Sequence, residues 1–247
     1  MSEPLQPRVC VVVPARNESG NILSVVSEVE SALAAYAPFE IIYVNDGSTD
    51  ATANEIRNLM QTRPHLRLVE HAQSCGQSAA VRTGVRAARA PIIITIDGDG
   101  QNDPSFMPAF LRQLEAAGSR CGLVQGQRVG RKDTAFKRFQ SRVANKVRNA
   151  VLKDGTRDTG CGFKCFPREV YLALPYFDAL HRFMPALVKR EGYELAYVDV
   201  IDRARQAGVS NYGFFDRLWV GIVDLMGVNW LIRRRKRVPV AQEVKLP

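Results

Sequence analysis

The amino-acid sequence predicts an α/β protein with a mostly parallel central sheet and helices on both faces. Short runs of branched apolar residues alternate with longer stretches in which apolar residues recur at helical spacing. Strands that alternate with helices form parallel sheets, which bind ligands at the carboxyl ends of their strands. Polar clusters follow several of the apolar runs, so the candidate functional residues should meet at that edge.

The first unit shows the pattern most clearly. The run from Val9 to Val13 is closed by Pro14, and residues 21–33 carry an apolar stripe that ends before Pro38. The apolar run at 92–96 is uninterrupted and stops abruptly at Asp97. We expect strands at 9–13, 41–44, 66–69, 92–96, 123–127 and 193–200. We expect helices at 21–33, 50–60, 104–117 and 183–190, and one more that follows the loop at 75–77 and ends at residue 88.

Size, charge and cysteine usage bound the class of protein. The chain has 247 residues, of which 46% are hydrophobic, and this suits one large domain with or without a small appendage. Its net charge of +9 indicates an anionic partner, which can be a nucleic acid, a phosphorylated substrate or an acidic membrane. Five cysteines without finger spacing indicate reduced thiols, and the polar start lacks a secretion signal, so we expect a cytoplasmic protein.

The strongest chemical signal is the acidic pair in the segment Asp97-Gly98-Asp99-Gly100-Gln101. Two carboxylates one residue apart, placed at the open end of a buried strand, offer hard oxygen ligands for Mg²⁺ or Mn²⁺. The glycines allow a ligand to approach the backbone closely. Such an ion can neutralise charge on a departing nucleoside diphosphate.

Three ordered motifs resemble those of the inverting family-2 glycosyltransferases, which have the GT-A fold. They are Pro14-Ala15-Arg16-Asn17-Glu18, Asn45-Asp46-Gly47-Ser48-Thr49-Asp50 and the acidic segment. The chain is most similar to the branch of dolichol-phosphate mannose synthase and the bacterial enzymes that charge undecaprenyl phosphate. That similarity rests on Gly76-Gln77-Ser78, on the glycine-rich residues 158–164 and on residues 203–212, where Asn211 replaces the lysine of many members.

The resemblance implies a role for each matching residue. The metal ligands would be Asp97, Asp99 and Gln101, and the catalytic residues would be Asp97, Asp99 and Arg128. The nucleotide sugar would contact Pro14, Arg16, Glu18, Asp46, Gln77, Asp97 and Arg205. The acceptor phosphate would contact Arg128, Lys137, Arg138 and Ser141. Residues 1–210 would form the GT-A domain, with a nucleotide-sugar half at 1–103 and an acceptor half at 104–210.

The implied reaction moves a sugar, with inversion, from a donor of GDP-mannose or UDP-hexose type to a polyprenyl phosphate. A phosphate monoester has a second pKa of about 6, so it is anionic at neutral pH and attacks without a base. A hydroxyl acceptor needs a carboxylate base instead. A family-2 enzyme acting on a polysaccharide or another hydroxyl is therefore the alternative, and a basic nucleic-acid-binding protein is a more distant one that the acidic pair disfavours.

The C-terminal segment 211–247 is predicted to be an amphipathic, basic tail near a membrane. Apolar residues recur at helical spacing from Phe214 to Trp230, and the run Arg233–Arg237 follows directly. Such a helix suits the surface of an anionic leaflet, although a helix packed on the core with a solvated charged end has the same pattern. We expect peripheral attachment to the cytoplasmic face of the inner membrane, with a possible integral membrane partner; the oligomeric state stays open.

Overall fold

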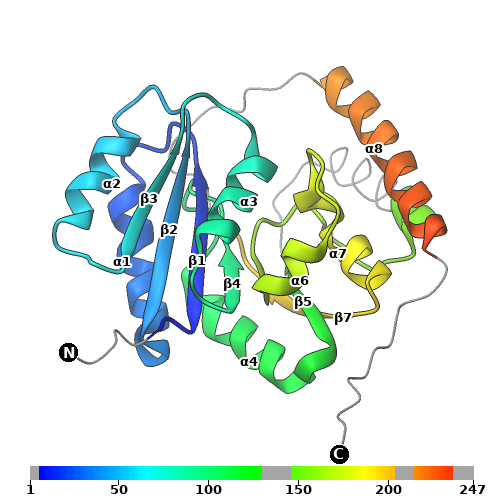
Figure 1. The fold of residues 1–247 in the computed structure, drawn as a ribbon, viewed down its shortest axis with the longest axis horizontal. Coiled ribbons are helices and arrows are strands. Elements are labelled where there is room, and N and C mark those ends of the chain that lie inside the picture. The colour runs from blue at the N-terminus through cyan, green and yellow to red at the C-terminus, as the bar shows by residue number, and fades with distance from the viewer. Residues whose placement is uncertain (1–5, 130–145, 204–213, 236–247) are drawn as a thin grey trace, which may run out of the picture.

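The computed structural model describes residues 6–129, 146–203 and 214–235, without the side chains of 214–219. Its seven-stranded sheet has the order β3-β2-β1-β4-β6-β5-β7 (Figure 1). The strands are β1 (Val9–Ala15), β2 (Phe39–Asp46), β3 (Leu66–His71), β4 (Ile92–Thr95), β5 (Cys121–Arg128), β6 (Lys164–Pro167) and β7 (Glu194–Val200). The helices are α1 (Ile22–Leu33), α2 (Thr52–Met60), α3 (Gln77–Ala87), α4 (Met107–Ala117), α6 (Arg168–Ala173), α7 (Leu180–Arg190) and α8 (Phe214–Arg234).

Helices cover both faces of the sheet because successive strand residues point to opposite sides. On β1, Val9, Val11 and Val13 join the apolar core under α1 and α4. Cys10 and Val12, from the same strand, join the core under α3, α6 and α7. A core on each face of the sheet confirms the predicted α/β class. Strands buried on both faces are continuous apolar runs in the sequence, as the pattern indicated.

One strand departs from the parallel pattern and was not predicted. Strand β6 pairs antiparallel with both β4 and β5, whereas the β1–β2, β1–β4, β2–β3 and β5–β7 pairs are parallel. It has only four residues, begins with the charged Lys164 and follows a glycine-rich loop, so it lacks the apolar run that marked the other strands. Because it runs backwards, its first residue lies at the edge where the parallel strands end.

The C-terminal helix α8 packs one of its faces on the domain. Val228 is buried, and Leu225 and Leu231 pack against the core beneath α7. Arg190 on α7 donates from Nε to the Leu231 carbonyl at 3.0 Å. This finding supports the core-packed alternative for one face of the helix. Within the described residues, no helix combines the length and apolar character that crossing a bilayer requires.

Candidate functional site

The carboxyl ends of β1, β2, β4, β5 and β7 lie along one edge of the sheet, together with the start of β6. This arrangement brings the first three sequence motifs to a common edge, as parallel strands require. Gly98 shows how close they are. A Cβ atom at this position would stand 3.0 Å from the Pro14 carbonyl oxygen and 3.4 Å from Cγ of Glu18.

The loops after β1 and β2 are joined by hydrogen bonds. Asn17, in the left-handed region at φ 58°, donates its N–H to Oγ of Ser48 at 3.0 Å, and its side-chain oxygen accepts from the Thr49 N–H at 2.8 Å. Glu18 donates its N–H to Oγ1 of Thr52 at 2.9 Å. These bonds order the backbone around Arg16, whose side chain is exposed and has no ion-pair partner among the described residues. The guanidinium is thus presented at the edge, where a ligand phosphate or base could meet it.

Asp46 holds the loop that follows β3. Its carboxylate accepts from Nδ1 of His71 at 2.7 Å and from Oγ of Ser74 at 2.8 Å, and the N–H groups of Cys75 and Gly76 add bonds of 2.7 and 2.9 Å. Burial opposes ionisation, but these donors outweigh it and lower the pKa of Asp46 below its usual value. A carboxylate has about four acceptor sites. His71 and the loop therefore occupy them all, and a direct contact of Asp46 with the nucleotide stays a prediction.

The ends of β2 and β3 and the same loop bring together a group of possible metal ligands that the sequence did not suggest. Within the described residues, ligand atoms of Asp46, His71 and Cys75 lie within 4.8 Å of one another. Both ring nitrogens of His71 already have partners, because Nε2 lies 2.9 Å from Oγ1 of Thr83. We assign no ion to this group, since its carboxylate and imidazole are both engaged in hydrogen bonds.

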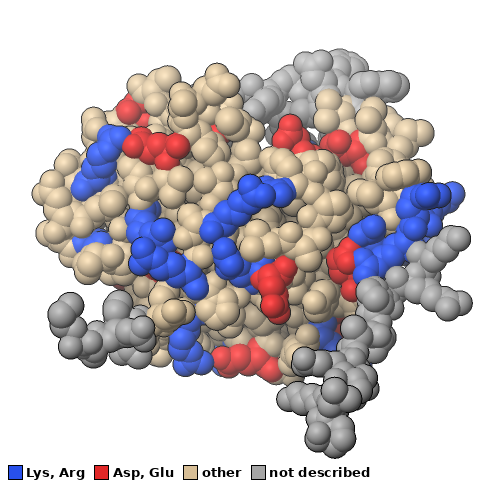
Figure 2. Space-filling view, viewed as in Figure 1, with Lys and Arg blue, Asp and Glu red and all other residues tan. Residues whose placement is uncertain are grey.

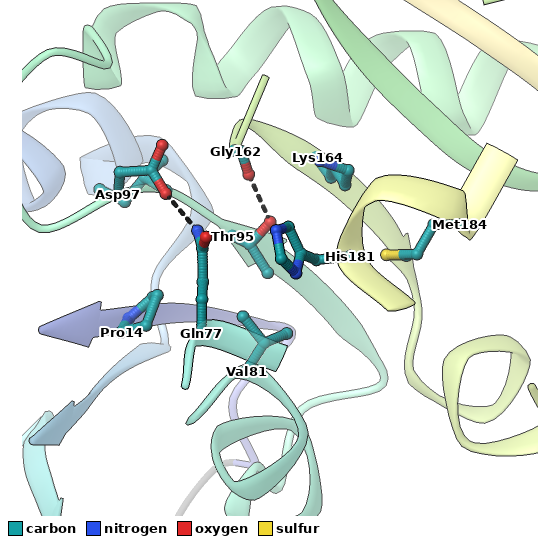
Figure 3. A pocket seen from close by; sticks show the side chains of 10 residues that line it. Pro14, Gln77, Val81, Thr95, Asp97, Gly162, Lys164, His181 and Met184 are labelled. Carbon is teal, nitrogen blue, oxygen red and sulfur yellow. Dashed lines mark hydrogen bonds between the residues drawn. The ribbon is translucent and has the colours of Figure 1, made fainter. Parts of the chain in front are cut away.

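Asp97 is held at the end of β4 by contacts on three sides. Its N–H donates to Oδ1 of Asn102 at 2.9 Å, and Nε2 of Gln77 donates to its Oδ1 at 2.8 Å (Figure 3). Gly162 packs directly against the carboxylate. Burial, followed by the negative charge of Asp99, raises the pKa of Asp97 to about 6. A partly exposed carboxylate that lies beside another one is a site that a cation would stabilise.

The donor set fits a hard divalent ion. Asp99 is buried, and its Oδ1 accepts the N–H of Gln101 at 3.1 Å, so the second carboxylate is oriented by the turn that contains Gly100 at φ 72°. The carbonyl of Gln101 accepts the N–H of Arg203 at 2.8 Å, which ties this turn to the end of β7. Asp97 and Asp99 thus present oxygen ligands of the kind that Mg²⁺ and Mn²⁺ prefer.

Arg128, at the end of β5, lies between two carboxylates. Asp158 accepts from its Nε at 2.5 Å and from Nη2 at 2.9 Å, and Asp202 accepts from Nη1 at 3.4 Å. Burial opposes the charge, but Asp158 and Asp202 outweigh it and raise the pKa of Arg128 above its usual value. Asp202 also accepts from Nδ2 of Asn102 at 3.3 Å. Sequence reasoning missed Asp202, although a carboxylate just past a parallel strand was the same signal as at Asp97.

A pocket extends from Asp97 between α3, α7 and the ends of β1, β4 and β6 (Figure 3). Its polar lining comes from Gln77, Thr95, Asp97, Lys164 and His181, and its apolar lining includes Val81 and Met184. Nδ1 of His181 lies 2.7 Å from Oγ of Ser78. Burial, aided by the positive charges of Lys164 and Arg182, lowers the pKa of His181 to about 3, so its ring is neutral at pH 7.

Five of the predicted residues lie outside the part of the chain that the structure describes. They are Lys137, Arg138 and Ser141 for the acceptor phosphate, Arg205 for the donor phosphates, and Asn211. The structure places Pro14, Glu18, Gln77, Asp97, Asp99 and Arg128 along the edge. The structure adds Lys164 and His181 to the residues around Asp97. The glycine-rich motif that ends at residue 164 was a sequence signal for Lys164, and His181 had none.

Comparisons with known proteins identify the family of the chain. The family model described as glycosyl transferase family 2 matches residues 10–174. A dodecaprenyl-phosphate galacturonate synthase of Rhizobium johnstonii is 33% identical over 96% of this chain and 71% of its own. An undecaprenyl-phosphate 4-deoxy-4-formamido-L-arabinose transferase of Pectobacterium carotovorum is 27% identical over 83% of this chain, which spans 63% of that relative's length.

Solved structures share the fold. Glucosyl-3-phosphoglycerate synthase of Mycobacterium tuberculosis, in complex with Mn²⁺, UDP and glucosyl-3-phosphoglycerate, has a TM-score of 0.67 at 22% identity and covers 95% of this chain and 82% of its own. A mannosyltransferase of Pyrobaculum calidifontis, in complex with GDP-Man and Mn²⁺, has a TM-score of 0.64 at 22% identity over 94% of this chain and 65% of its own. Both likenesses concern the fold, and they confirm the expected GT-A arrangement.

Proposed function

Because the chain belongs to glycosyl transferase family 2, we propose that it transfers a sugar from a nucleotide-sugar donor to a polyprenyl phosphate with inversion. The two relatives with prenyl-phosphate acceptors in their names support this acceptor class. Their named sugars differ, because galacturonate carries a carboxylate and 4-deoxy-4-formamido-L-arabinose does not. The comparisons thus leave the sugar open, as they do the choice between UDP and GDP.

One observation from the site carries the choice of acceptor. The two carboxylates on the acceptor side, Asp158 and Asp202, both bind the guanidinium of Arg128. Asp158 is a poor general base because two N–H groups of Arg128 occupy its oxygens. Burial raises the pKa of Asp202 in spite of Arg128, but Asn102 and Arg128 engage its two oxygens. A phosphate monoester needs no base, because it is already anionic at pH 7. The arrangement therefore favours a phosphate acceptor over a hydroxyl.

The residues divide between donor and acceptor as follows. Mg²⁺ or Mn²⁺, held by Asp97, Asp99 and Gln101, would neutralise the charge of the departing diphosphate. Gln77 positions Asp97 through its 2.8 Å hydrogen bond. Pro14, Arg16 and Glu18 lie at the end of β1, where they would contact the nucleoside. Arg128 and the basic residues that follow it would attract the acceptor phosphate.

The outer face of α8 supports attachment to a membrane. Val220, Val223, Met226 and Trp230 are all more than half exposed, and they recur at helical spacing. Basic side chains gather at the C-terminal end of this helix (Figure 2), where Arg233 and Arg234 are exposed. An apolar, tryptophan-bearing face beside cations suits an anionic leaflet. Attachment at the cytoplasmic face, where nucleotide sugars are made, belongs to this proposal.

A transfer assay tests the proposed function. The protein is incubated with Mn²⁺, a labelled nucleotide sugar and one of three acceptors, namely undecaprenyl phosphate, the matching prenol or an oligosaccharide. We expect an acid-labile, lipid-soluble product with the prenyl phosphate alone, and loss of at least 100-fold in rate in Asp99→Ala, because the variant lacks a metal ligand. Transfer to the prenol or the oligosaccharide at a comparable rate would show that a hydroxyl is the acceptor.

A further inference from the structure

Asn102 connects the candidate metal ligands to the acceptor side of the site. Only 5% of its surface is exposed, and its Oδ1 accepts the N–H of Asp97 at 2.9 Å. Its Nδ2 donates to Oδ1 of Asp202 at 3.3 Å, and Oδ2 of Asp202 accepts from Nη1 of Arg128 at 3.4 Å. One buried amide thus lies between a candidate metal ligand and a carboxylate that holds the candidate acceptor cation.

The two partners determine which way the amide of Asn102 points. The Asp97 N–H can only donate, and an ionised Asp202 can only accept, so the oxygen of the amide meets the first and its nitrogen the second. The reversed amide would place two donors together at one end and two oxygens together at the other. Of the side chains of this size, an amide satisfies both neighbours, whereas a carboxylate or an apolar group does not.

The residues on either side of Asn102 are joined to the same distant segment. The carbonyl of Gln101 accepts the N–H of Arg203 at 2.8 Å, and Oδ1 of Asp103 lies 2.8 Å from Nη2 of Arg203. Asn102 and Asp202 are 100 positions apart in the chain. The backbone bond and the ion pair hold the two segments side by side, so the place of residue 102 does not depend on its own side-chain bonds.

Both ends of this chain of hydrogen bonds carry chemistry. The bond to the Asp97 N–H fixes the point at which the backbone leaves β4, and with it the direction of the carboxylate. Groups that orient a metal ligand in this way change metal affinity by about 10- to 100-fold. At the other end, Asp158 binds Nε and Nη2 of Arg128, and Asp202 binds Nη1. The two carboxylates together set the direction in which the guanidinium faces an acceptor.

We propose that Asn102 is a positioning residue for both halves of the reaction. Its oxygen orients the metal ligand Asp97, and its nitrogen acts through Asp202 on the cation that receives the acceptor phosphate. The inference rests on the proposed function, because it takes the donor to lie at Asp97 and the acceptor at Arg128. The relative placement of the two substrates therefore depends on one buried amide.

A pair of substitutions that reverses the amide tests this role. In Asn102→Asp two carboxylates face each other, and in Asp202→Asn two amide nitrogens do, because the new oxygen stays on Arg128. In the double variant the carboxylate at 102 accepts from the Asp97 N–H and from the amide at 202, so every link is restored and the net charge is unchanged. We expect each single variant to raise the KM for undecaprenyl phosphate about 10-fold, the effect of one hydrogen bond to a charged group.

The double variant should return to within about 3-fold of the wild-type KM, whereas independent effects would multiply to about 100-fold. Asp202→Asn should leave the affinity for Mn²⁺ alone, measured by electron paramagnetic resonance, near the wild-type value, because the bond from Asn102 to Asp97 remains. Asn102→Leu removes both bonds, so it should weaken Mn²⁺ binding about 10-fold and also raise the acceptor KM. Asn54→Asp, at an exposed position of α2, is the matched control and should change neither quantity.

Melting temperatures in EDTA give a readout that needs no substrate or metal. Each single variant of the reversed pair should melt about 3 °C below the wild type, and the double variant should recover most of this loss. If Asn102→Leu does not fold, the reversed pair still decides. A double variant as impaired as the product of its singles would overturn the inference, and so would an unchanged acceptor KM in both singles.

The outcomes also separate this inference from the proposed function. Absence of transfer to undecaprenyl phosphate by the wild type would defeat the proposed function alone. Recovery of the melting temperature in the double variant, with weaker Mn²⁺ binding in Asn102→Leu, would then still support the inference, and failure of both would overturn it. Normal transfer by the wild type without any rescue in the double variant would leave the proposed function standing and defeat the inference.

Discussion

The carboxylate of Asp97 lies so close to the backbone of Gly162 that a Cβ atom at position 162 would stand 2.3 Å from its Oδ2 and 2.5 Å from its Cγ. The loop before β6 therefore forms one wall of the candidate metal site. An alanine here would force the Asp97 carboxylate to shift, because contacts under 3 Å make an atom move.

Gly162→Ala should displace the Asp97 carboxylate and lower metal-dependent transfer by about 100-fold, the effect of a misplacement of about 1 Å in an active site. Steady-state rates over a range of Mn²⁺ concentrations measure it, and the Mn²⁺ requirement should rise. Gly221→Ala on α8 is the matched control, since its Cβ would meet no atom within 4 Å. Full activity in Gly162→Ala would show that the carboxylate can move without consequence.

The raised pKa of Asp97 predicts a pH-dependent stability. The pKa of Asp97 is about 6 in the folded protein, whereas an unperturbed aspartate has a pKa of 3.8. The folded state therefore binds the proton more tightly than the unfolded state does. Without metal, the contribution of this group to stability therefore falls as pH rises from about 4 to 6 and stays low above that. Asp97→Asn should raise the melting temperature by about 3 °C at pH 7.5, equivalent to about 1 kcal/mol for this partly exposed group.

Differential scanning fluorimetry in the presence of EDTA, from pH 4 to 8, measures this effect. The melting curves of Asp97→Asn and the wild type should converge towards pH 4, where the wild-type carboxyl is protonated. Added Mn²⁺ should stabilise the wild type at pH 7.5 and leave the variant unchanged. A difference in melting temperature that stayed constant with pH would contradict the assigned pKa.

Arg128 should matter for stability as well as for catalysis. Arg128→Met leaves Asp158 and Asp202 near one another without their cation, and loss of one partner from a buried pair costs about 3 kcal/mol. We expect a fall in melting temperature of roughly 8 °C for a chain of this length. Asp202→Asn should lower it much less, because the amide oxygen still accepts from Arg128. Equal losses in the two variants would show that the cluster is not held by its charges.

The outer face of α8 gives a test of membrane attachment. Met226→Ser with Trp230→Ser should reduce flotation with anionic liposomes by at least 10-fold, because two exposed apolar groups are removed from the interface. Leu23→Ser on α1 is the control, since Leu23 is 56% exposed and lies far from α8 in the sequence. Flotation should also weaken with salt. Flotation of the double variant at the wild-type level would place the contact elsewhere.

Sequence patterns predicted most of the fold because the strands at β1, β2 and β4 are continuous apolar runs ending in polar clusters. They did not predict β6, whose four residues are set by pairing with β4 and β5 and not by local pattern. They did not predict the six-residue helix α6 either. The same limit applies to side chains. The acidic pair was identifiable from its spacing, whereas the engagement of Asp46 by its own loop and the position of Asp202 beside Arg128 depend on contacts between distant segments.

The packing of α8 on α7 has a mechanical consequence. The first turns of α7 supply His181 and Met184 to the pocket, and its last turn holds α8 through Arg190. A protein that lies on a bilayer has to reach the lipid head group at a fixed height above the membrane surface. If the outer face of α8 lies on a leaflet, as we propose, the single helix α7 connects that face to the pocket at Asp97, so the fold and not a flexible tether sets the height of the pocket above the leaflet.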